Sequence, residues 1–328
     1  YIFIFLFVTT INNLFAQSYN APESVDYHLE SNLFLISNSG NGQIISDDGI
    51  GNLNIVANNI GVGPHGLEVI DDIVYACSGG RLKAFNILNG NQILNHNING
   101  QFLNGITHKD DDIFITDFSA RKLYRYNVIS GNHNLFADLI NYGTPNGVAY
   151  DNILDRLIVV GWGANAPIWE ISLNDSIVSV IANTNHSNID GIALDPCGNY
   201  YISVWGNNAI YQYDDNFSSP QILVTGQSQP ADIFYESNSQ ILAIPNSGNN
   251  TVNFISINCN PSVIFEVNQI SCYFSQGYLY SFEGEKQLYN TAGQLIWEGS
   301  STKTHIGKLA TGTYILKSEK KSEMIYIQ

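Results

Sequence analysis

The chain has 328 residues and a formal net charge of −16, although only 13% of its residues are charged. The acidic excess lies in residues 1–258, because residues 259–328 hold six Lys and six acidic residues and are neutral. Such a field repels phosphate backbones and anionic membranes, so nucleic acid is a disfavoured partner and metal cations or neutral ligands are favoured. The low charge and abundant Asn, Gly, Ile and Tyr are typical of many short strands joined by tight turns.

The first element in chain order is an apolar N-terminal segment. Residues 1–7 form a continuous apolar run, and Leu14-Phe15-Ala16-Gln17 follows. An apolar core that ends in a small residue predicts a secretory signal peptide, residues 1–16, with cleavage after Ala16. The run is too short to cross a bilayer, so we expect no membrane span.

A short sequence motif, called the phrase below, then recurs six times along the chain. Its copies are Pro22-Glu23-Ser24-Val25, Pro64-His65-Gly66-Leu67, Leu103-Asn104-Gly105-Ile106, Pro145-Asn146-Gly147-Val148, Ile189-Asp190-Gly191-Ile192 and Pro230-Ala231-Asp232-Ile233. Successive second positions are 42, 39, 42, 44 and 41 residues apart. A period near forty residues, with four short strand-like runs per unit, predicts a β-propeller blade. We therefore expect an all-β fold with a six-bladed β-propeller over residues 17–262.

The middle units divide in the same way. The third unit predicts strands that open at 105–107 and continue at 113–116, 122–126 and 134–137, with turns on Asp, Ser, Gly and Asn. The fifth unit predicts strands at 200–204 and 209–213, and the last at 233–235, 241–244 and 251–254. Two segments are candidates for the fourth strand of the last blade: residues 263–265 and the mature N-terminus near Tyr19. The sequence leaves both open.

The chain holds four cysteines. Cys77 and Cys197 lie three predicted blades apart, so we do not expect them to pair. Cys259 and Cys272 are close in sequence and flank the end of the repeats, so they are a candidate disulfide pair in an oxidising compartment, and the sequence leaves this pairing open.

Residues 263–328 break the forty-residue period. They predict short strands at 287–289, 295–297, 314–316 and 324–326, and hence a small C-terminal β-sandwich. Residues 288–295, followed by 306–317 with the order Leu-x-x-Gly-x-Tyr-x-Leu, resemble the type A C-terminal sorting domain of the type IX secretion system. The resemblance implies recognition by that machinery, export through the periplasm, release or attachment at the outer surface, and a bacterium of the Bacteroidetes type. A plain β-sandwich accessory module is the alternative.

The second positions of the six phrases are equivalent in every blade. They read Glu23, His65, Asn104, Asn146, Asp190 and Ala231. The innermost strands of a propeller line a central channel, so their first residues converge on one mouth. Four of the six residues offer oxygen ligands, and two of these are anionic. Ca²⁺ prefers such carboxylate and amide oxygens, whereas zinc favours His and Cys. We therefore predict a calcium site, or that of another divalent cation, formed by Glu23, Asn104, Asn146 and Asp190.

These residues carry a family resemblance over residues 22–258. The chain resembles the six-bladed propellers of the senescence-marker protein, gluconolactonase, strictosidine synthase and paraoxonase group, which have NHL-like repeats. In gluconolactonase-like members a blade-one Glu, a blade-four Asn and a blade-five Asp hold a divalent metal, with a blade-three Asn nearby. Glu23, Asn146, Asp190 and Asn104 match those places. Pro64-His65-Gly66 resembles the phrase that places a His over the calcium in paraoxonase-like lactonases.

The resemblance implies a secreted, monomeric, calcium-dependent hydrolase of lactones or esters. His65 is the expected general base, because an ordinary His titrates near neutral pH, and Asp190 is expected to share that role. Two alternatives stay open: a non-catalytic propeller that binds a protein or glycan at the cell surface, and a metal-dependent lyase. Trp162 and Trp205 follow equivalent strands, and they either form the wall of a pocket above the metal or pack between blades.

Overall fold

The computed structural model describes residues 17–259, 272–275, 278–281, 285–301, 303–306, 309, 312–318 and 322–327. The chain divides into two compact units at Cys259 and Asn260. The predicted signal peptide, residues 1–16, and the candidate closing strand, residues 263–265, lie outside the described residues. No helix in the described part of the chain is long and apolar enough to cross a membrane.

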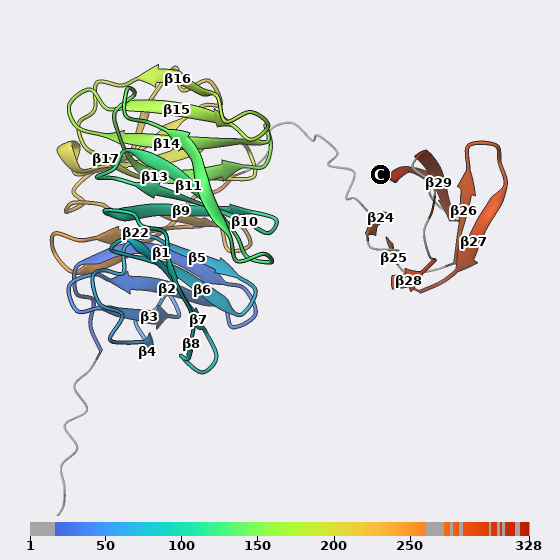
Figure 1. Ribbon diagram of the computed structural model, residues 1–328, viewed down its shortest axis with the longest axis horizontal. Coiled ribbons are helices and arrows are strands. Elements are labelled where there is room, and N and C mark those ends of the chain that lie inside the picture. The colour runs from blue at the N-terminus through green and yellow to red at the C-terminus, as the bar shows by residue number, and fades with distance from the viewer. Residues whose placement is uncertain are drawn as a thin grey trace, which may run out of the picture. The chain divides into compact units, whose positions relative to one another are not determined.

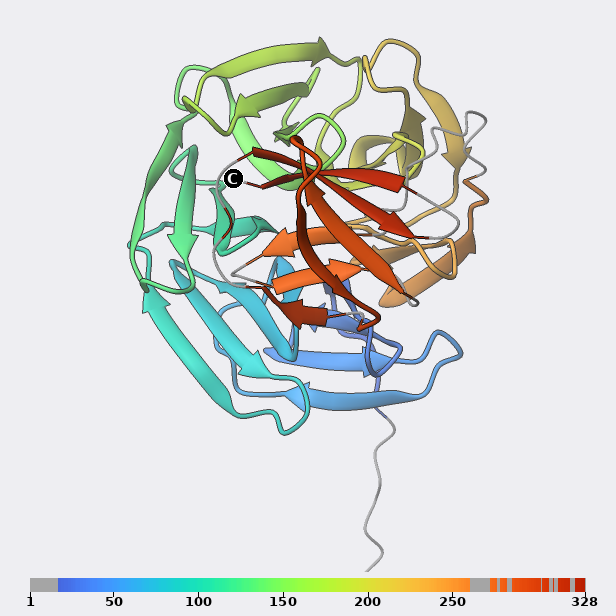
Figure 2. The ribbon, with the colours of Figure 1, turned by 90° about the vertical axis from the view of Figure 1, so that its right-hand side faces the viewer.

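Within residues 17–259, six antiparallel sheets follow one another around a ring in chain order, from blue to orange in Figure 2. Each of the first five sheets has four strands in sequence order. Blade one holds β1 (Pro22–His28), β2 (Leu33–Asn38), β3 (Gln43–Asp47) and β4 (Leu53–Ala57). Blade two holds β5 (Leu67–Ile70), β6 (Ile73–Ser78), β7 (Arg81–Asn86) and β8 (Gln92–Asn97). Blade three holds β9 (Leu103–Lys109), β10 (Asp112–Asp117), β11 (Lys122–Asn127) and β12 (His133–Asp138).

The second half of the ring repeats this order (Figure 1). Blade four holds β13 (Thr144–Asp151), β14 (Arg156–Trp162), β15 (Pro167–Ser172) and β16 (Val178–Asn183). Blade five holds β17 (Ile189–Leu194), β18 (Tyr200–Val204), the 3₁₀ turn η1 (Trp205–Asn207), β19 (Ala209–Tyr213) and β20 (Gln221–Val224). Blade six holds β21 (Phe234–Glu236), β22 (Ile241–Asn246) and β23 (Thr251–Ser256). The all-β, six-bladed fold predicted from the forty-residue period is confirmed.

The apolar core is distributed between neighbouring blades. Each second strand is almost wholly buried, as in β10, whereas the fourth strand is largely exposed, as in β12. This explains the continuous apolar runs of the second strands, since both faces of these strands pack against other blades. A separate cluster of buried side chains fills each junction, from the one between blades one and two to the one between blades six and one. The ring therefore has no single centre of packing.

The first and last blades meet through side chains and main-chain bonds. Val25 and Ile36 of blade one pack against Ala243 of blade six. The amide of Asp232 donates to the carbonyl of Glu23 at 2.9 Å. Within residues 17–259, the sheet of blade six has only three strands.

The N-terminal end of the described chain does not complete blade six. Tyr19 lies in no strand, packs against blade one and hydrogen-bonds Asp47. The amides of Ser39 and Gly40 in the β2–β3 turn donate to the carbonyls of Ala21 and Asn20. The proposal that the segment near Tyr19 forms the fourth strand of blade six is therefore wrong.

One disulfide corrects the cysteine pairing. Cys259 is bonded to Cys197, with their Cα atoms 6.0 Å apart, and not to Cys272. Cys197 lies in the turn between β17 and β18, and Cys259 follows β23 of the adjacent blade. In the sequence interpretation, Cys259 and Cys272 are a candidate pair because they are close in sequence. In the structure, the segment after β23 lies beside the β17–β18 turn of blade five, so Cys259 meets Cys197 instead. Cys77 is buried and has a free thiol.

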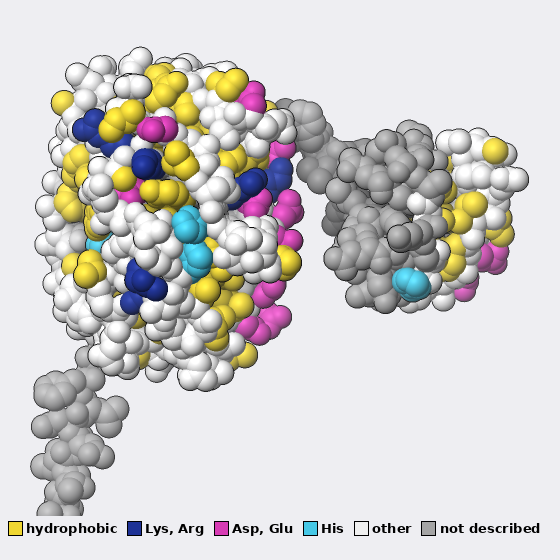
Figure 3. Space-filling model, viewed as in Figure 1, with side chains coloured by type: hydrophobic (Ala, Val, Ile, Leu, Met, Phe, Trp, Pro, Cys, Tyr) yellow, Lys and Arg dark blue, Asp and Glu magenta, His cyan; other side chains and the backbone are white. Residues whose placement is uncertain are grey.

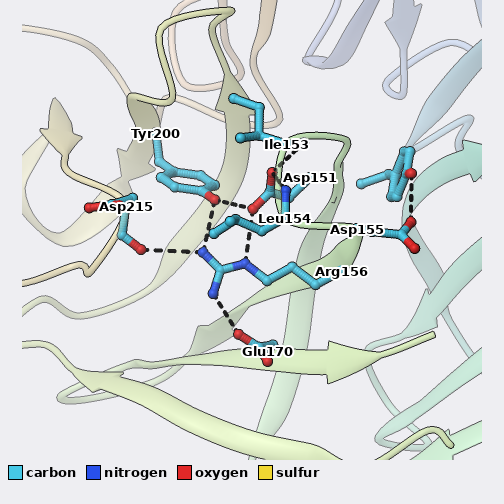
Figure 4. Close-up of polar contacts among 9 residues, drawn as sticks. Asp151, Ile153, Leu154, Asp155, Arg156, Glu170, Tyr200 and Asp215 are labelled. Atoms are coloured by element: carbon cyan, nitrogen blue, oxygen red, sulfur yellow. Dashed lines mark hydrogen bonds and ion pairs between the residues drawn. The ribbon is translucent and has the colours of Figure 1, made fainter. Parts of the chain in front are cut away.

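Blades four and five are joined by a buried polar cluster around Arg156 (Figure 4). Its Nε donates to Asp151 at 2.9 Å, and its two terminal nitrogens donate to Glu170 at 2.5 Å and to the Tyr200 hydroxyl at 3.1 Å. Tyr200 also donates to Asp151. Because Asp151 is fully buried, these bonds supply the compensation that its charge requires.

The second unit contains two small antiparallel sheets. One holds β24 (Cys272–Ser275), β25 (Tyr278–Ser281) and β28 (Lys303–His305). The other holds β26 (Lys286–Asn290), β27 (Leu295–Gly299), β29 (Gly312–Ser318) and β30 (Ser322–Ile327). Leu279, Leu288 and Leu316 are buried in its core. The four strands predicted from residues 287–326 are all present.

Candidate functional site

The first residues of the inner strands do not pair regularly with the second strand of their blade. The register shifts between Pro22 and Val25 in β1, and at the equivalent points of β9, β13 and β17. Such irregularities bend a strand and redirect the side chains beside them. The second residue of each phrase in these four blades therefore lies where the strand leaves its partner, and it is free to face the channel.

The glycine at the third position of the phrase allows neighbouring blades to approach closely. A Cβ on Gly66 would lie 2.1 Å from the Asn104 carbonyl oxygen, and one on Gly147 would lie 2.6 Å from that of Asp190. The amide of Gly66 in turn donates to the Asn104 carbonyl at 3.0 Å. Glycine is needed at these positions for space, and the contact brings each second-position residue beside the next.

Hydroxyl side chains fix two of these carbonyls. The hydroxyl of Thr116 accepts from the Gly105 amide at 2.8 Å and donates to the Asn146 carbonyl at 2.6 Å. Ser203 makes the same pair of bonds to Gly191 and Ala231, both at 2.7 Å. The backbone beneath the predicted ligands is thus held from two blades at once.

Three of the four predicted ligands form a continuous chain. Asn104 Nδ2 donates to Asn146 Oδ1 at 2.5 Å, and Asn146 hydrogen-bonds the carboxyl group of Asp190. All three side chains are buried, with exposed fractions of 6%, 2% and 3%. Glu23 is electrostatically coupled to Asp190 and is hydrogen-bonded to Ser247 of blade six. The structure thus brings Glu23, Asn104, Asn146 and Asp190 to one end of the channel.

Asp232 is a fifth oxygen donor that the sequence interpretation missed. It stands at the third position of the sixth phrase, where four other blades have Gly, and its Oδ2 accepts from the Ser24 hydroxyl at 2.9 Å. The interpretation considered only the second position, Ala231. An acidic residue in a position otherwise held by Gly or Ser was the available signal.

The carboxyl groups of this cluster are electrostatically strained. Burial raises the pKa of Glu23 to about 7, although a hydrogen bond from Ser247 lowers it. Burial raises the pKa of Asp232 to about 7 as well, and the bond from Ser24 opposes this. The pKa of Asp190 is raised well above its ordinary value by burial and then by the charges of Glu23 and Asp232. Each negative charge therefore disfavours the others.

The donors fit a hard cation. Three carboxyl groups and two amides belong to one hydrogen-bonded and electrostatically coupled cluster, although the ligand atoms of Glu23, Asp190 and Asp232 do not all lie within 4.8 Å of one another. In the described part of the chain none of these carboxylates forms an ion pair with Lys, Arg or His. Ca²⁺ takes six to eight oxygen ligands, so these side chains leave positions for water or substrate. Among the described residues, clusters of at least three His, Cys, Asp or Glu with close ligand atoms occur elsewhere, around His28 and Asp195.

His65, the second residue of the blade-two phrase, packs against an aromatic ring. Its ring packs edge-on against Phe102 at 4.6 Å, and its Nδ1 is buried without a hydrogen-bond partner in the described part of the chain. Burial lowers the pKa of His65 to about 4. The imidazole is therefore neutral at pH 7, and it is a weaker base than the ordinary pKa of His implied.

Aromatic rings continue from His65 around the same mouth. Phe102 contacts Phe118, Phe118 contacts Trp162, and Trp162 contacts Trp205, with centroid distances of 5.7, 5.8 and 5.3 Å. These rings come from the ends of blades two to five and are partly exposed. Trp162 and Trp205 thus pack against each other between blades four and five, which is one of the two alternatives given for them above. We call this row of five rings the aromatic arc.

The opposite end of the inner strands carries a pocket of about 430 Å³. It lies between the ends of β5, β9, β13 and β17, and Glu68, His108 and Tyr150 line it. His108 Nδ1 lies 2.5 Å from Glu68 Oε1. Asp26 is buried nearby, and the charge of Glu68 contributes to the raised pKa of its carboxyl group after burial itself. The charge of Asp232 also raises the pKa of Asp26, so this acid is electrostatically coupled to the cluster at the other end of the inner strands.

No protein-family model matches the sequence, and neither does any curated protein. Solved structures do share the fold. A protein of unknown function from Bacteroides thetaiotaomicron aligns with a TM-score of 0.60 and 14% identity, over 73% of this chain and 70% of that one. A chain of the nidogen/laminin complex aligns with a TM-score of 0.58 and 14% identity, over 66% and 86%.

A gluconolactonase from Xanthomonas campestris aligns equally well. Its TM-score is 0.59 at 14% identity, over 70% of this chain and 84% of that one. At this identity the likeness shows the propeller fold, which catalytic and non-catalytic proteins share. The site residues must be argued from their own geometry.

Proposed function

We propose that the propeller holds a divalent cation, Ca²⁺, at the channel mouth and hydrolyses a lactone or ester beside it. The observation that carries this proposal is the electrostatic coupling of the Glu23, Asp190 and Asp232 carboxyl groups beside the hydrogen-bonded amides of Asn104 and Asn146, without a basic partner in the described part of the chain. Buried carboxylates without counter-charge are costly unless a cation accompanies them. The likeness in fold to a gluconolactonase supports the same class.

The side chains of the site have three proposed roles: to bind the cation, to orient a ligand and to act as a base. The three carboxylates with Asn146 would hold the cation, and Asn104 orients Asn146 through its 2.5 Å hydrogen bond. Bound there, the cation supplies a Lewis acid for the carbonyl oxygen of the substrate. His65 and Asp190 are the candidate bases for water, and both are in basic form at pH 7 when a cation offsets the burial of Asp190.

A panel of lactones and aryl esters, assayed with calcium and with chelator, tests the proposal. We expect turnover with calcium only, and we expect Glu23→Gln and Asp190→Asn to abolish it while Asp111→Asn, an exposed turn acid, leaves it unchanged. If no metal co-purifies and activity and melting temperature ignore the chelator, the hydrolase proposal fails. Turnover that survives both site substitutions contradicts the residue assignment.

The aromatic arc supports a second candidate, a non-catalytic propeller that binds a glycan or protein at the cell surface. Partly exposed rings from four blades offer stacking surface for a sugar or an apolar side chain. The propeller of the nidogen/laminin complex has the same fold. Retention on a glycan array that Phe118→Ala abolishes, together with no turnover of any ester, favours this function.

Export completes the proposal. We propose that the protein acts outside the cell as a monomer and that the C-terminal unit is its type IX sorting domain. The two small sheets of that unit support an accessory role, because their core is separate from that of the propeller. Expression with and without residues 263–328 in a host that has this secretion system tests it. Equal export of both forms contradicts the sorting role.

A further inference from the structure

A second group of metal-binding side chains lies where blade one meets blade two, outside the channel. His28 ends β1, Glu30 lies in the β1–β2 turn, and Asp72 lies in the β5–β6 turn. One ligand atom of each residue lies within 4.8 Å of the others. His28 and Asp72 are 44 positions apart in sequence, which is about one blade. The β1–β2 turn and the β5–β6 turn therefore lie next to each other in adjacent blades.

The imidazole of His28 is held rigidly. Its side chain is buried, and its Nδ1 lies 2.7 Å from the Ser31 hydroxyl, while its Nε2 lies 3.1 Å from Asp72 Oδ1. A metal-bound imidazole needs such a partner on its other nitrogen, because that contact fixes the ring and the tautomer. Ser31 can either donate or accept, so it serves both tautomers.

The distances fit one ion. Bonds of about 2.05 and 2.1 Å from zinc to Nε2 and Oδ1 would subtend about 97° across the observed 3.1 Å separation. That angle lies between octahedral and tetrahedral values. Glu30 is exposed and can rotate to supply a third ligand, which leaves at least one position for water. One imidazole with two carboxylates favours a zinc-like ion over calcium.

The surrounding charge favours a cation. Figure 3 shows acidic side chains gathered along the right-hand edge of the propeller, where the turns between first and second strands lie. The exposed acids of these turns are Glu30, Asp71, Asp110, Asp111 and Asp155. Such a field raises the local concentration of divalent cations.

We propose that His28, Glu30 and Asp72 bind a divalent transition ion of the zinc class, which joins the first two blades. Without the ion, Nε2–H donates to Asp72 and Ser31 donates to Nδ1. In the metal-bound form the ring proton is on Nδ1, Nδ1–H donates a hydrogen bond to the Ser31 hydroxyl, and the metal takes the place of the proton at Nε2. This site is independent of the channel cation.

Titration of the full chain with Co²⁺ tests the proposal, after chelator treatment and with Ca²⁺ in excess to fill oxygen sites. A His133→Gln background removes the His96–His133 pair, whose ring nitrogens lie 2.8 Å apart and would compete. We expect one Co²⁺ per chain with visible absorption bands. Asp72→Asn and Glu30→Gln should each weaken binding about tenfold or more, whereas Asp71→Asn, an exposed neighbour, should not.

Zn²⁺ provides the second measurement. Long-range ¹H–¹⁵N spectra should show the shift of a single buried ring nitrogen, which disappears in Asp72→Asn. Glu23→Gln should retain both signals, because it alters only the channel. Absence of the Co²⁺ bands, equal affinity in Asp72→Asn and Asp71→Asn, or a Zn²⁺ shift confined to other histidines would overturn the proposal.

Discussion

Replacing Glu23 with Gln should stabilise the cation-free protein at alkaline pH, even though it removes a proposed ligand. Burial raises the pKa of Glu23 to about 7 from an ordinary value of 4.5. The unfolded chain therefore loses this proton near pH 4.5, whereas the folded chain keeps it until about pH 7. The folded state loses stability as pH rises across that window, and the loss is complete above it.

The pKa values give the size of the effect. A shift of about 2.5 units corresponds to roughly 3.4 kcal/mol. Glu23 is half-buried, so solvent screens part of this and the expected gain for Glu23→Gln at pH 8 is about 2–3 kcal/mol. For a unit of this size, that corresponds to a rise in melting temperature of roughly 4–12 °C. Gln keeps the shape of Glu and a hydrogen-bonding oxygen for Ser247.

Thermal unfolding at pH 8 with chelator, followed by tryptophan fluorescence, measures the difference. Calcium at about 1,000 times its dissociation constant should reverse the order, since it adds about 4.1 kcal/mol to the wild type, which exceeds the gain expected for the variant. At pH 4 the two proteins should melt together. Asp48→Asn is the control, because Asp48 is exposed and hydrogen bonds, chiefly from Asn52, lower its pKa. A Glu23→Gln protein that melts at or below the wild type in chelator at pH 8 would refute the electrostatic reasoning.

Three further substitutions probe the ring itself. Replacing Cys197 and Cys259 by Ser should cost about 4 kcal/mol, because the bond closes a loop with a sequence separation of 62 residues; chemical denaturation measures it, and reduction of the wild type should reproduce the loss. Arg156→Met should cost about 3–5 kcal/mol by leaving Asp151 buried without its partner, and an unchanged midpoint in denaturant would contradict that role. Gly147→Ala should cost about 1–3 kcal/mol and weaken calcium binding, since its Cβ would lie 2.6 Å from the Asp190 carbonyl oxygen; calorimetric titration that finds wild-type affinity would count against the close approach.

Most of the fold could be predicted from the forty-residue period of the sequence. It predicted the order and approximate bounds of strands such as 113–116 and 200–204, because each unit must repeat the same buried pattern to pack against its neighbours. The same period placed Glu23, Asn104, Asn146 and Asp190 at equivalent points. Equivalent points converge in a closed ring, so contacts between residues about forty positions apart were predictable from the sequence.

The period could not supply contacts between non-equivalent positions. Cys197 lies in a turn of blade five, whereas Cys259 lies where the chain leaves the last blade, and no repeat relates them. Likewise, His28 ends β1 whereas Asp72 lies in the β5–β6 turn, so the two residues occupy different points of the repeat. Such pairs depend on how far each turn reaches toward the next blade, which side-chain packing decides and sequence spacing does not.

The junction between blades six and one explains why the period did not predict Asp232 as a site residue. At four blades the third position is Gly because the next blade approaches too closely for a side chain. Blades six and one instead carry Asp232 and Ser24 there, and these side chains bond each other at 2.9 Å. The carboxyl group of Asp232 therefore occupies a position that repetition reserves for glycine, and its charge acts on Asp190. Asp232 supplies one of the three charges proposed to hold the cation, so Asp232→Asn should weaken calcium binding although Asp232 stands outside the equivalent set.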